Sequence, residues 1–212
     1  LDPFLSSNPQ YQIELYDRKL SLLNLNGKHH VFVDFNSKQL IFRSQAHLNA
    51  ELVIKAVLGK KKQPTTIMDC TAGFGKDSYL MSLTGSRIIA YESNPVMFAL
   101  LADGLNRFNI DNISLRKKDA LREVKLTECE IIYIDPMYPA TKKSAKNNKD
   151  MMFLQTFVGH QADMAEELFT QSLLSKAKKI VIKRPVKSDY VMNRKPTSQI
   201  IGKAARFDIY VK

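Results

Sequence analysis

Thr65-Thr-Ile-Met-Asp69-Cys-Thr-Ala-Gly73-Phe-Gly75-Lys76-Asp77 is the stretch that decides the fold of this chain of 212 residues. Its short apolar run, bounded by polar residues, predicts a buried strand. The two glycines allow the backbone to turn sharply and to approach a ligand closely. We expect a helix to begin at Asp77 and to end near Leu83. A strand, a glycine loop and a helix in this order are typical of the first unit of a doubly wound α/β sheet.

Strands and helices are expected to alternate downstream of this unit. Apolar runs predict strands over 87–92, 113–116, 131–135 and 179–183, and helical spacing predicts helices over 95–108 and 163–174. Residues 199–202 and 206–211 are expected to form a terminal hairpin. The sequence therefore predicts an α/β, Rossmann-like, doubly wound and mostly parallel sheet with a C-terminal antiparallel hairpin.

The first 45 residues have a different pattern. Short runs rich in β-formers lie at 12–16, 20–23, 30–35 and 39–43, and Asn26-Gly27 and Asn36-Ser37 are expected to form turns between them. This pattern predicts a small antiparallel meander over residues 1–45. A helix over 46–58, ending at Gly59, then opens a second domain that spans residues 46–212.

Composition and charge narrow the class of protein. Lys and Arg number 32 against 21 Asp and Glu, which gives a net charge of +11 and a pI of about 9.6. A polyanionic partner such as nucleic acid explains this excess better than solubility alone. The sequence has no apolar run near the roughly 20 residues that span a bilayer, and two cysteines without metal-ligand spacing. We expect a cytoplasmic protein without a membrane segment, a disulfide or a metal.

Acids follow four of the predicted parallel strands, at Asp69, Glu92, Asp119 and Asp135. The carboxyl ends of such strands form the ligand crevice of an open α/β sheet, so these acids should lie together. Glu92 can accept two hydrogen bonds from ribose hydroxyls, and Asp119 can contact an adenine amine. Each could also be an ordinary surface acid.

The glycine loop argues against a dinucleotide. Ser78 stands where the third glycine of G-x-G-x-x-G would be, and Asp77 lies where a pyrophosphate would meet the helix. A carboxylate there suits a cationic or neutral ligand such as S-adenosylmethionine. The alternative for Asp77 is a helix N-cap.

Asp135-Pro136-Met137-Tyr138-Pro139 ends the fourth parallel strand. An acid, a rigid carbonyl and a flat ring together can hold a planar base and its exocyclic amine. The motif resembles the (N/D)-P-P-(Y/F) signature of amino-group methyltransferases, with Met137 in place of the second proline.

The resemblance extends over nearly the whole chain, and residues 65–212 look like a class I S-adenosylmethionine-dependent methyltransferase. It is similar to the J-type family of bacterial small-subunit (16S) rRNA guanine-N2 methyltransferases. The matching segments are Val31-Phe-Val-Asp-Phe35, Asp69–Asp77, Glu92–Val96, Asp135–Pro139, Lys143-Ser-Ala145, Val181–Pro185 and Arg206–Tyr210. The resemblance implies cofactor contacts at Lys76, Asp77, Glu92, Ser93, Asp119, Ala120 and Asp135, beside the loop residues Asp69, Gly73 and Gly75. Lys76 and Ser93 depart from the pattern, because arginine is common at both positions.

Basic residues follow the motif directly. Lys142, Lys143, Lys146 and Lys149 could clamp phosphates around a splayed nucleotide, and Lys183-Arg184 could add to the same rim. The alternative is a solvated charged loop.

The combined hypothesis is methylation of a guanine N2 amine in small-subunit rRNA or in the 30S subunit. Asp135 and the Pro136 carbonyl would accept hydrogen bonds from the amine, and Tyr138 would stack on the base. Three alternatives stay open: an adenine-N6 or protein-amide methyltransferase, a non-catalytic RNA-binding module, and a Rossmann oxidoreductase.

Overall fold

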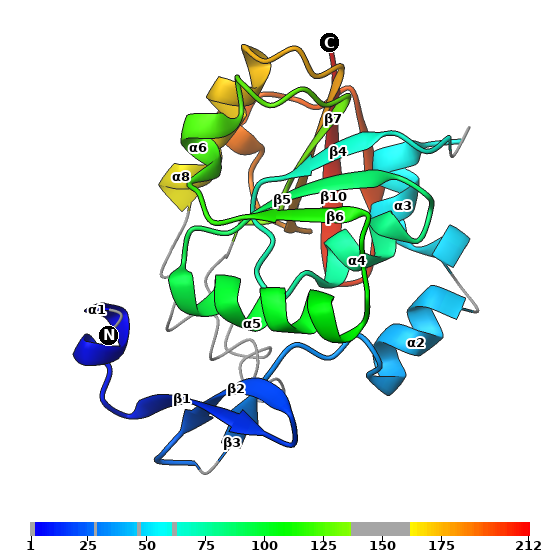
Figure 1. Ribbon diagram of the computed structural model, residues 1–212. Coiled ribbons are helices and arrows are strands. Elements are labelled where there is room, and N and C mark those ends of the chain that lie inside the picture. The colour runs from blue at the N-terminus through cyan, green and yellow to red at the C-terminus, as the bar shows by residue number, and fades with distance from the viewer. Residues whose placement is uncertain (1–2, 28, 46–47, 61–62, 137–161) are drawn as a thin grey trace.

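The computed structural model describes residues 3–27, 29–45, 48–60, 63–136 and 162–212, which contain a large and a small β-sheet (Figure 1). The large sheet has seven strands in the order β6-β5-β4-β7-β8-β10-β9. They are β4 (Thr66–Asp69), β5 (Arg87–Tyr91), β6 (Ile113–Arg116), β7 (Ile131–Ile134), β8 (Lys179–Pro185), β9 (Ser198–Ile201) and β10 (Ala205–Val211). The first five pair in parallel, whereas β10 is antiparallel to β8 and β9. The predicted doubly wound sheet with its antiparallel hairpin is confirmed.

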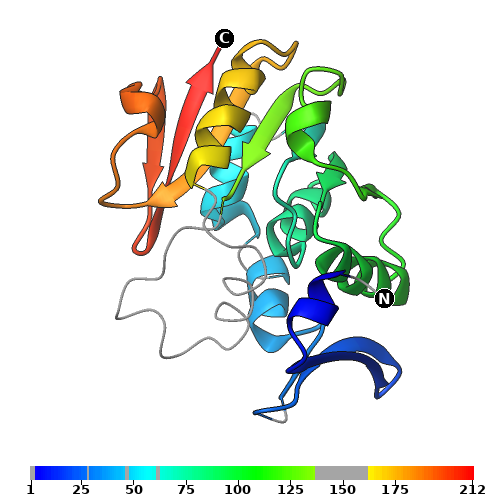
Figure 2. The same ribbon diagram turned by 90° about the vertical axis from the view of Figure 1, so that its left-hand side faces the viewer.

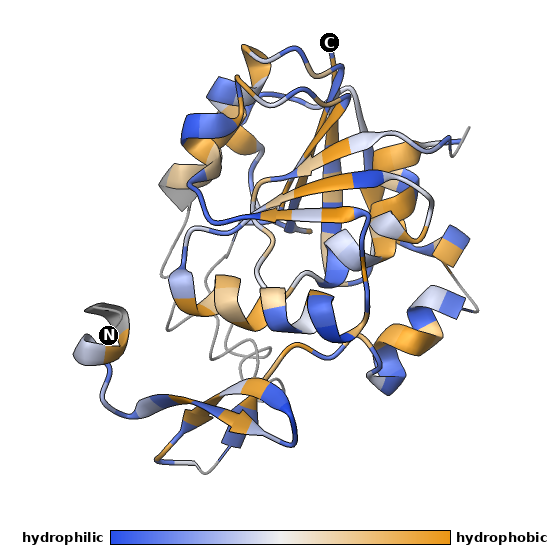
Figure 3. Ribbon diagram, viewed as in Figure 1, coloured by the Kyte–Doolittle hydropathy of each residue, from blue (hydrophilic) through white to orange (hydrophobic). Residues whose placement is uncertain are grey.

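Helices cover both faces of this sheet. The helices α3 (Leu52–Leu58), α4 (Lys76–Ser82) and α5 (Pro95–Arg107) pack on one face, and α6 (Ala120–Glu123) and α8 (Ala162–Leu173) pack on the other (Figure 2). Strand residues divide between the two cores by strict alternation. Ile67 and Tyr133 belong to the first core, and their chain neighbours Met68 and Ile132 belong to the second. Strands buried on both faces explain the continuous apolar runs of the sequence, which Figure 3 shows along the sheet.

The small sheet is antiparallel, in the order β1-β2-β3. It comprises β1 (Tyr11–Tyr16), β2 (Lys19–Asn24) and β3 (His29–Val31), and the short helix α1 (Pro3–Ser7) precedes it. The sheet lies beside α5, and Val33 packs so tightly on that helix that a Cβ added to Gly104 would lie 2.5 Å from Val33 Cγ1. Phe35 stacks on Tyr79 of α4 with ring centroids 4.8 Å apart. The N-terminal region therefore shares the core of the large sheet, and the division into domains at residue 45 stays a prediction.

The predicted fourth strand of the meander, over 39–43, is wrong. These residues lie in the helix α2 (Lys38–Gln45), and the predicted turn at Asn36-Ser37 begins that helix, because the Ser37 carbonyl accepts from the N–H groups of Leu40 and Ile41. A short apolar run fits a strand or a helix equally well by spacing alone. Only Leu40 of this helix is buried.

The predicted helix over 46–58 is shorter than expected. The described part consists of a 3-10 turn, η1 (Leu48–Ala50), and of α3, separated by Glu51 in an extended conformation. Gly59 ends α3 with a φ of 66°, as predicted. A second 3-10 turn, η2 (Val191–Asn193), lies between β8 and β9. In the part of the chain that the structure describes, no helix has the length and apolarity needed to cross a membrane.

Candidate active site

The four acids predicted to follow the parallel strands lie along one edge of the large sheet. Because β6, β5, β4 and β7 are neighbouring parallel strands, their carboxyl ends bring Asp119, Glu92, Asp69 and Asp135 to the same side of the molecule. We call this side the carboxyl edge. It is where ligands bind in open α/β sheets.

The glycine loop shapes the centre of the carboxyl edge. Gly73 and Gly75 both adopt positive φ angles, 53° and 69°, and Gly75 is the N-cap residue of α4. A Cβ on Gly75 would lie 2.5 Å from Leu101 Cδ1, so a side chain there would displace Leu101 and would also be strained by the positive φ. A Cβ on Gly73 would meet nothing closer than the Thr71 carbonyl at 4.0 Å. The space above Gly73 is therefore open to a ligand.

Asp69 stabilises this loop through two hydrogen bonds to its carboxylate. Its Oδ1 accepts from the Thr71 N–H at 3.0 Å and its Oδ2 from the Ser78 hydroxyl at 2.5 Å. The side chain is buried, and burial raises the pKa of Asp69 to about 7 although both hydrogen bonds oppose that rise. These contacts make Asp69 a structural support of the loop.

Glu92 ties the loop to the end of β5. One carboxylate oxygen accepts from the Gly73 N–H at 3.0 Å, and the other accepts from the Asn94 N–H at 2.7 Å. Burial raises the pKa of Glu92, and the backbone donors partly offset that rise. Each carboxylate oxygen can accept a second hydrogen bond, so ribose contact stays a prediction for this side chain.

Asp77 and Asp135 share one lysine. Lys183 Nζ, on β8, donates to Asp77 Oδ2 at 2.9 Å and to Asp135 Oδ2 at 2.7 Å. Tyr133 on β7 donates its hydroxyl to the same Asp77 oxygen at 2.7 Å. Burial has the largest effect on the pKa of Asp77 and would raise it, but Lys183, Tyr133 and Arg43 together outweigh burial, so the pKa of Asp77 is lowered. The N-cap alternative for Asp77 is wrong, because Gly75 occupies the cap position.

This geometry changes the role expected for Lys183. The sequence predicted that Lys183 would join an RNA-binding rim, but its ammonium faces two carboxylates instead. Arg184 beside it donates from Nε to the Ser188 hydroxyl at 3.2 Å.

Arg43 connects the N-terminal region to the carboxyl edge. Its guanidinium pairs with Glu51 at 2.7 Å and lies 3.6 Å from Asp77 Oδ1. Residues of α2 therefore contribute charge to the site at the end of the large sheet.

The remaining predicted residues take various positions around the crevice. Asp119 is the N-cap of α6, where its Oδ1 accepts from the Leu121 N–H at 3.0 Å, and Ala120 is buried behind it. Ser93 is exposed, and Lys76 Nζ lies 5.7 Å from the centre of the Phe74 ring. Pro136 is buried. Tyr138, Lys142, Lys143, Lys146 and Lys149 lie outside the described residues.

Tyr133, Thr71 and Arg43 make contacts that sequence reasoning missed. Tyr133 precedes Asp135 by two positions. Because residues i and i+2 of a strand share one face, the sequence could have predicted that Tyr133 lies beside the site. The Thr71 hydroxyl accepts from the Asp135 N–H at 2.7 Å and fixes the start of the motif. Nothing in the sequence around Arg43 indicated its partners.

The chemistry of this edge fits a ligand with cationic and hydroxyl groups. Carboxylates dominate it, and a phosphate would meet like charge there. Within the described residues, no group of three or more side chains could hold a metal ion.

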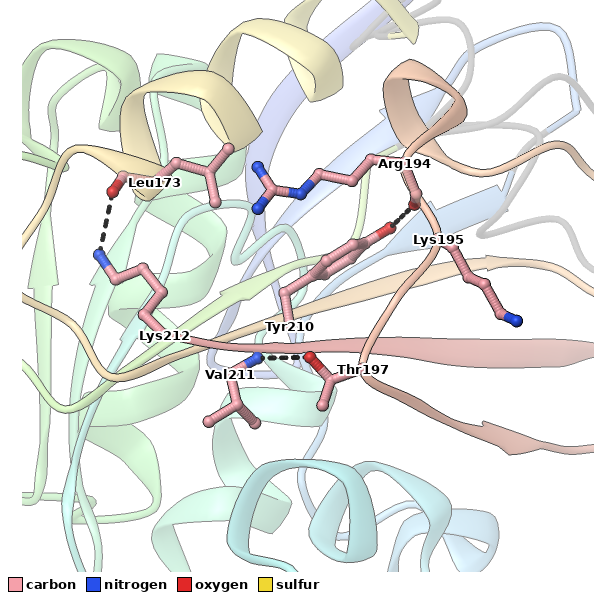
Figure 4. Close-up of a pocket in the computed structure, with 7 residues that line it drawn as sticks. All are labelled: Leu173, Arg194, Lys195, Thr197, Tyr210, Val211 and Lys212. Atoms are coloured by element: carbon pink, nitrogen blue, oxygen red, sulfur yellow. Dashed lines mark hydrogen bonds between the residues drawn. The ribbon is translucent and has the colours of Figure 1, made fainter.

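A cavity of about 390 Å³ lies elsewhere, near the end of β10, lined by Leu173, Arg194, Lys195, Thr197, Tyr210, Val211 and Lys212 (Figure 4). Because β10 runs antiparallel to β8 and Val211 pairs with Lys179, that cavity lies at the opposite edge of the sheet.

Comparison with known proteins agrees with this geometry. A family model described as "Putative SAM-dependent methyltransferase" matches residues 4–212. Proteins named ribosomal RNA small subunit methyltransferase J are similar in sequence. The one from Francisella tularensis subsp. novicida is 32% identical over 99% of this chain and 94% of its own length, and the one from Francisella philomiragia is 35% identical over 85% and 80%. A SAM-dependent methyltransferase of known structure from Neisseria gonorrhoeae is 28% identical, with a TM-score of 0.70 over 91% of this chain and 79% of that one.

Proposed function

This chain belongs to the SAM-dependent methyltransferase family, and we propose that it methylates the N2 amine of a guanine in small-subunit rRNA. The observation that carries the proposal is the similarity, over nearly the full chain, to proteins named small-subunit rRNA methyltransferase J. A net charge of +11 supports a polyanionic substrate. Such a protein would act in the cytoplasm, on rRNA or on a 30S particle.

The carboxyl edge would hold the cofactor. S-adenosylmethionine would supply a methyl group on a sulfonium, and the neutral thioether of S-adenosylhomocysteine would be the leaving group as the carbon–sulfur bond breaks. We propose that Asp77 faces the cationic part of the cofactor, that Glu92 accepts from ribose hydroxyls, and that Asp119 contacts the adenine amine. The open space above Gly73 leaves room for the ligand close to the backbone. Lys76, Ser93 and Ala120 would complete the contacts.

The end of β7 would hold the target base. Asp135 and the Pro136 carbonyl would accept hydrogen bonds from the exocyclic amine and direct its lone pair toward the methyl group. Catalysis then depends mainly on alignment and on stabilisation of positive charge that develops on the nitrogen. Tyr138 would stack on the base, and Lys142, Lys143, Lys146 and Lys149 would contact phosphates.

The direct test is transfer of tritium from labelled S-adenosylmethionine to 16S rRNA, offered both as naked RNA and as 30S subunits from a methylation-deficient strain. Digestion to nucleosides should place the label in N2-methylguanosine. The Asp135→Asn protein, which keeps the shape of the side chain and loses its charge, is the matched control. It should bind the cofactor and transfer little label.

The alternatives give different products in the same assay. Label in N6-methyladenosine or in protein would replace the guanine proposal by the corresponding substrate. Cofactor binding without transfer to any of these substrates would favour a non-catalytic RNA-binding module. Stabilisation by NAD and not by S-adenosylmethionine would favour an oxidoreductase.

A further inference from the structure

Lys183 is held at the point where the cofactor and base sites of the proposed function would meet. Its ammonium contacts Oδ2 of Asp77, assigned above to the cofactor, and Oδ2 of Asp135, assigned above to the target amine. The side chains of Lys183, Asp77 and Asp135 are only 29%, 14% and 32% exposed, so solvent screens their charges weakly. A single cation therefore bridges the two functional carboxylates.

The cations around this bridge are distributed unequally between Asp77 and Asp135. The charged or titratable side chains that face it come from α4, β7, β8, the end of β4 and α2: Asp77, Tyr133, Asp135, Lys183, Asp69 and Arg43. Besides its partner Glu51, Arg43 lies near Asp77 of the bridge, at 3.6 Å from the oxygen that Lys183 does not touch. Among the described residues, Lys183 is the cation that pairs with Asp135. Replacement of Lys183 would thus affect Asp135 more than Asp77.

Two carboxylates that contact the same nitrogen atom lie close together, and like charges in such a pair favour protonation of one partner. Burial raises the pKa of Asp135, and Lys183 opposes that rise. The lysine itself stays charged, because the carboxylates of Asp135 and Asp77 outweigh the effect of burial on its pKa. A protonated Asp135 would lose acceptor capacity toward an amine.

We propose that Lys183 is a positioning residue for methyl transfer, which keeps Asp135 ionised and oriented toward the target amine while Asp77 stays ionised toward the cofactor. The proposal rests on the proposed function. It explains why a lysine lies near the carboxyl end of β8 beside the two acids, 106 positions from Asp77 and 48 from Asp135 in the chain.

The sign of the pH effect follows from removal of the cation. Without Lys183 the apparent pKa of the carboxylate pair rises, so the active, ionised form is lost at a higher pH than in the wild type. The acid limb of the pH profile should move upward by about 1–3 pH units in Lys183→Met, as expected for removal of an adjacent opposite charge. Lys183→Arg keeps the charge and should keep the acid limb near the wild-type position, even if the rate falls.

The first measurement is the single-turnover rate of methyl transfer from pH 5 to 9, for wild type, Lys183→Met, Lys183→Gln and Lys183→Arg. Lys176→Met is the matched control, because Lys176 is 85% exposed and far from the carboxyl edge. Thermal melts should be recorded for every variant, and Lys183→Gln serves if Lys183→Met does not fold. A rate that falls by the same factor at all pH values in Lys183→Met would overturn the proposal, as would an acid limb that moves equally in Lys183→Arg.

The second measurement does not depend on turnover. Calorimetry of S-adenosylhomocysteine binding at pH 6.5, in two buffers of different ionisation enthalpy, reports protons released on binding. Lys183→Met should release up to about one proton, because the ligand's ammonium favours the ionised pair, and wild type should release close to none. Equal release by both proteins would contradict the role of Lys183. Wild-type protein that binds the ligand but methylates no RNA would instead contradict the proposed function and leave this measurement valid.

Discussion

Lys179 and Lys183 lie four residues apart on β8 and on the same face of the sheet, and they contact groups near opposite ends of the strand. Lys179 donates to the Val57 carbonyl at 2.6 Å and so fastens α3 to the sheet, and burial lowers its pKa. Lys183 bridges Asp77 and Asp135, which outweigh burial and raise its pKa. One edge of the sheet uses a lysine as a hydrogen-bond donor to backbone, and the other uses a lysine as a counter-ion.

The large sheet thus divides its tasks between its two edges. At the carboxyl edge, buried and partly buried acids are held by hydrogen bonds and by one lysine. The opposite edge, where the parallel strands begin, is called the amino edge. There Lys212 donates to carbonyls at and just beyond the end of α8, those of Ser172 and Ser175 among them. We therefore expect substitutions at the carboxyl edge to change ligand affinity and rate, and similar substitutions at the amino edge to change only stability.

The largest effect should come from Asp135→Ala. If Asp135 holds the target amine, single-turnover transfer should fall by about 10²–10³-fold, as for removal of one preorganised group that stabilises developing charge. Asp111→Ala is the matched change at the other edge, because Asp111 is exposed just before β6. Near-normal transfer by a folded Asp135→Ala protein would end the mechanism proposed here.

A smaller loss is expected for Glu92→Ala. Each charge-assisted hydrogen bond to a ribose hydroxyl is worth roughly 1.5–3 kcal/mol, and the change also leaves the Gly73 N–H without its acceptor. Calorimetric affinity for S-adenosylhomocysteine should fall by at least about 10-fold. Glu128→Ala, at an 88% exposed position near the amino edge, should bind normally. An unchanged affinity in Glu92→Ala would remove Glu92 from the cofactor site.

A third prediction compares basic residues near the proposed base site with basic residues elsewhere. The four lysines near the base site lie outside the residues that the structure describes. Changing Lys142, Lys143, Lys146 and Lys149 to alanine should flatten the salt dependence of RNA affinity. On single-stranded RNA, the slope should decrease by roughly 0.7 log units for each phosphate that is no longer neutralised by a lysine. Cofactor affinity should not change. Four alanines at exposed basic residues elsewhere, Lys125, Lys176, Lys178 and Lys203, control for net charge. Identical salt slopes for wild type and the loop variant would make the loop a solvated charge run.

The smallest effect should come from Lys179→Met. Removal of the hydrogen bond to Val57 should lower the free energy of unfolding by about 1 kcal/mol in a denaturant titration. The pH profile of methyl transfer should stay that of wild type, in contrast to Lys183→Met. A shifted acid limb in Lys179→Met would show that the two edges are not separate in function.

Much of the fold could be predicted because local pattern and global topology agree. Buried parallel strands are continuous apolar runs, and the acids that follow them mark the edge of the sheet, so the positions of Asp69, Glu92 and Asp135 followed from spacing alone. The strand predicted over 39–43 was wrong because the local pattern did not decide the structure. A run of five residues that mixes apolar and polar side chains fits a strand or a helix equally well.

The partners at the site were harder to predict than the fold. A lysine and an arginine before Pro185 looked like phosphate ligands, because the carboxylates that Lys183 meets are distant in sequence and come close only when β4, β7 and β8 pair. The N-cap alternative for Asp77 stayed open for a similar reason, because its partners Lys183 and Tyr133 are also distant in sequence. Local sequence indicates that a side chain can carry charge, and only the tertiary structure supplies the charge that it meets.

Arg43 has a consequence for how this protein can be divided into fragments. A fragment that starts at residue 46 would keep the whole large sheet, yet it would lack the arginine beside Asp77 and the side chains of Val33 and Phe35 that cover α4 and α5. The exposed apolar surface would favour aggregation. In evolutionary terms, the N-terminal region is therefore hard to exchange between relatives as a free module, because a replacement must reproduce both a packing surface and a charge.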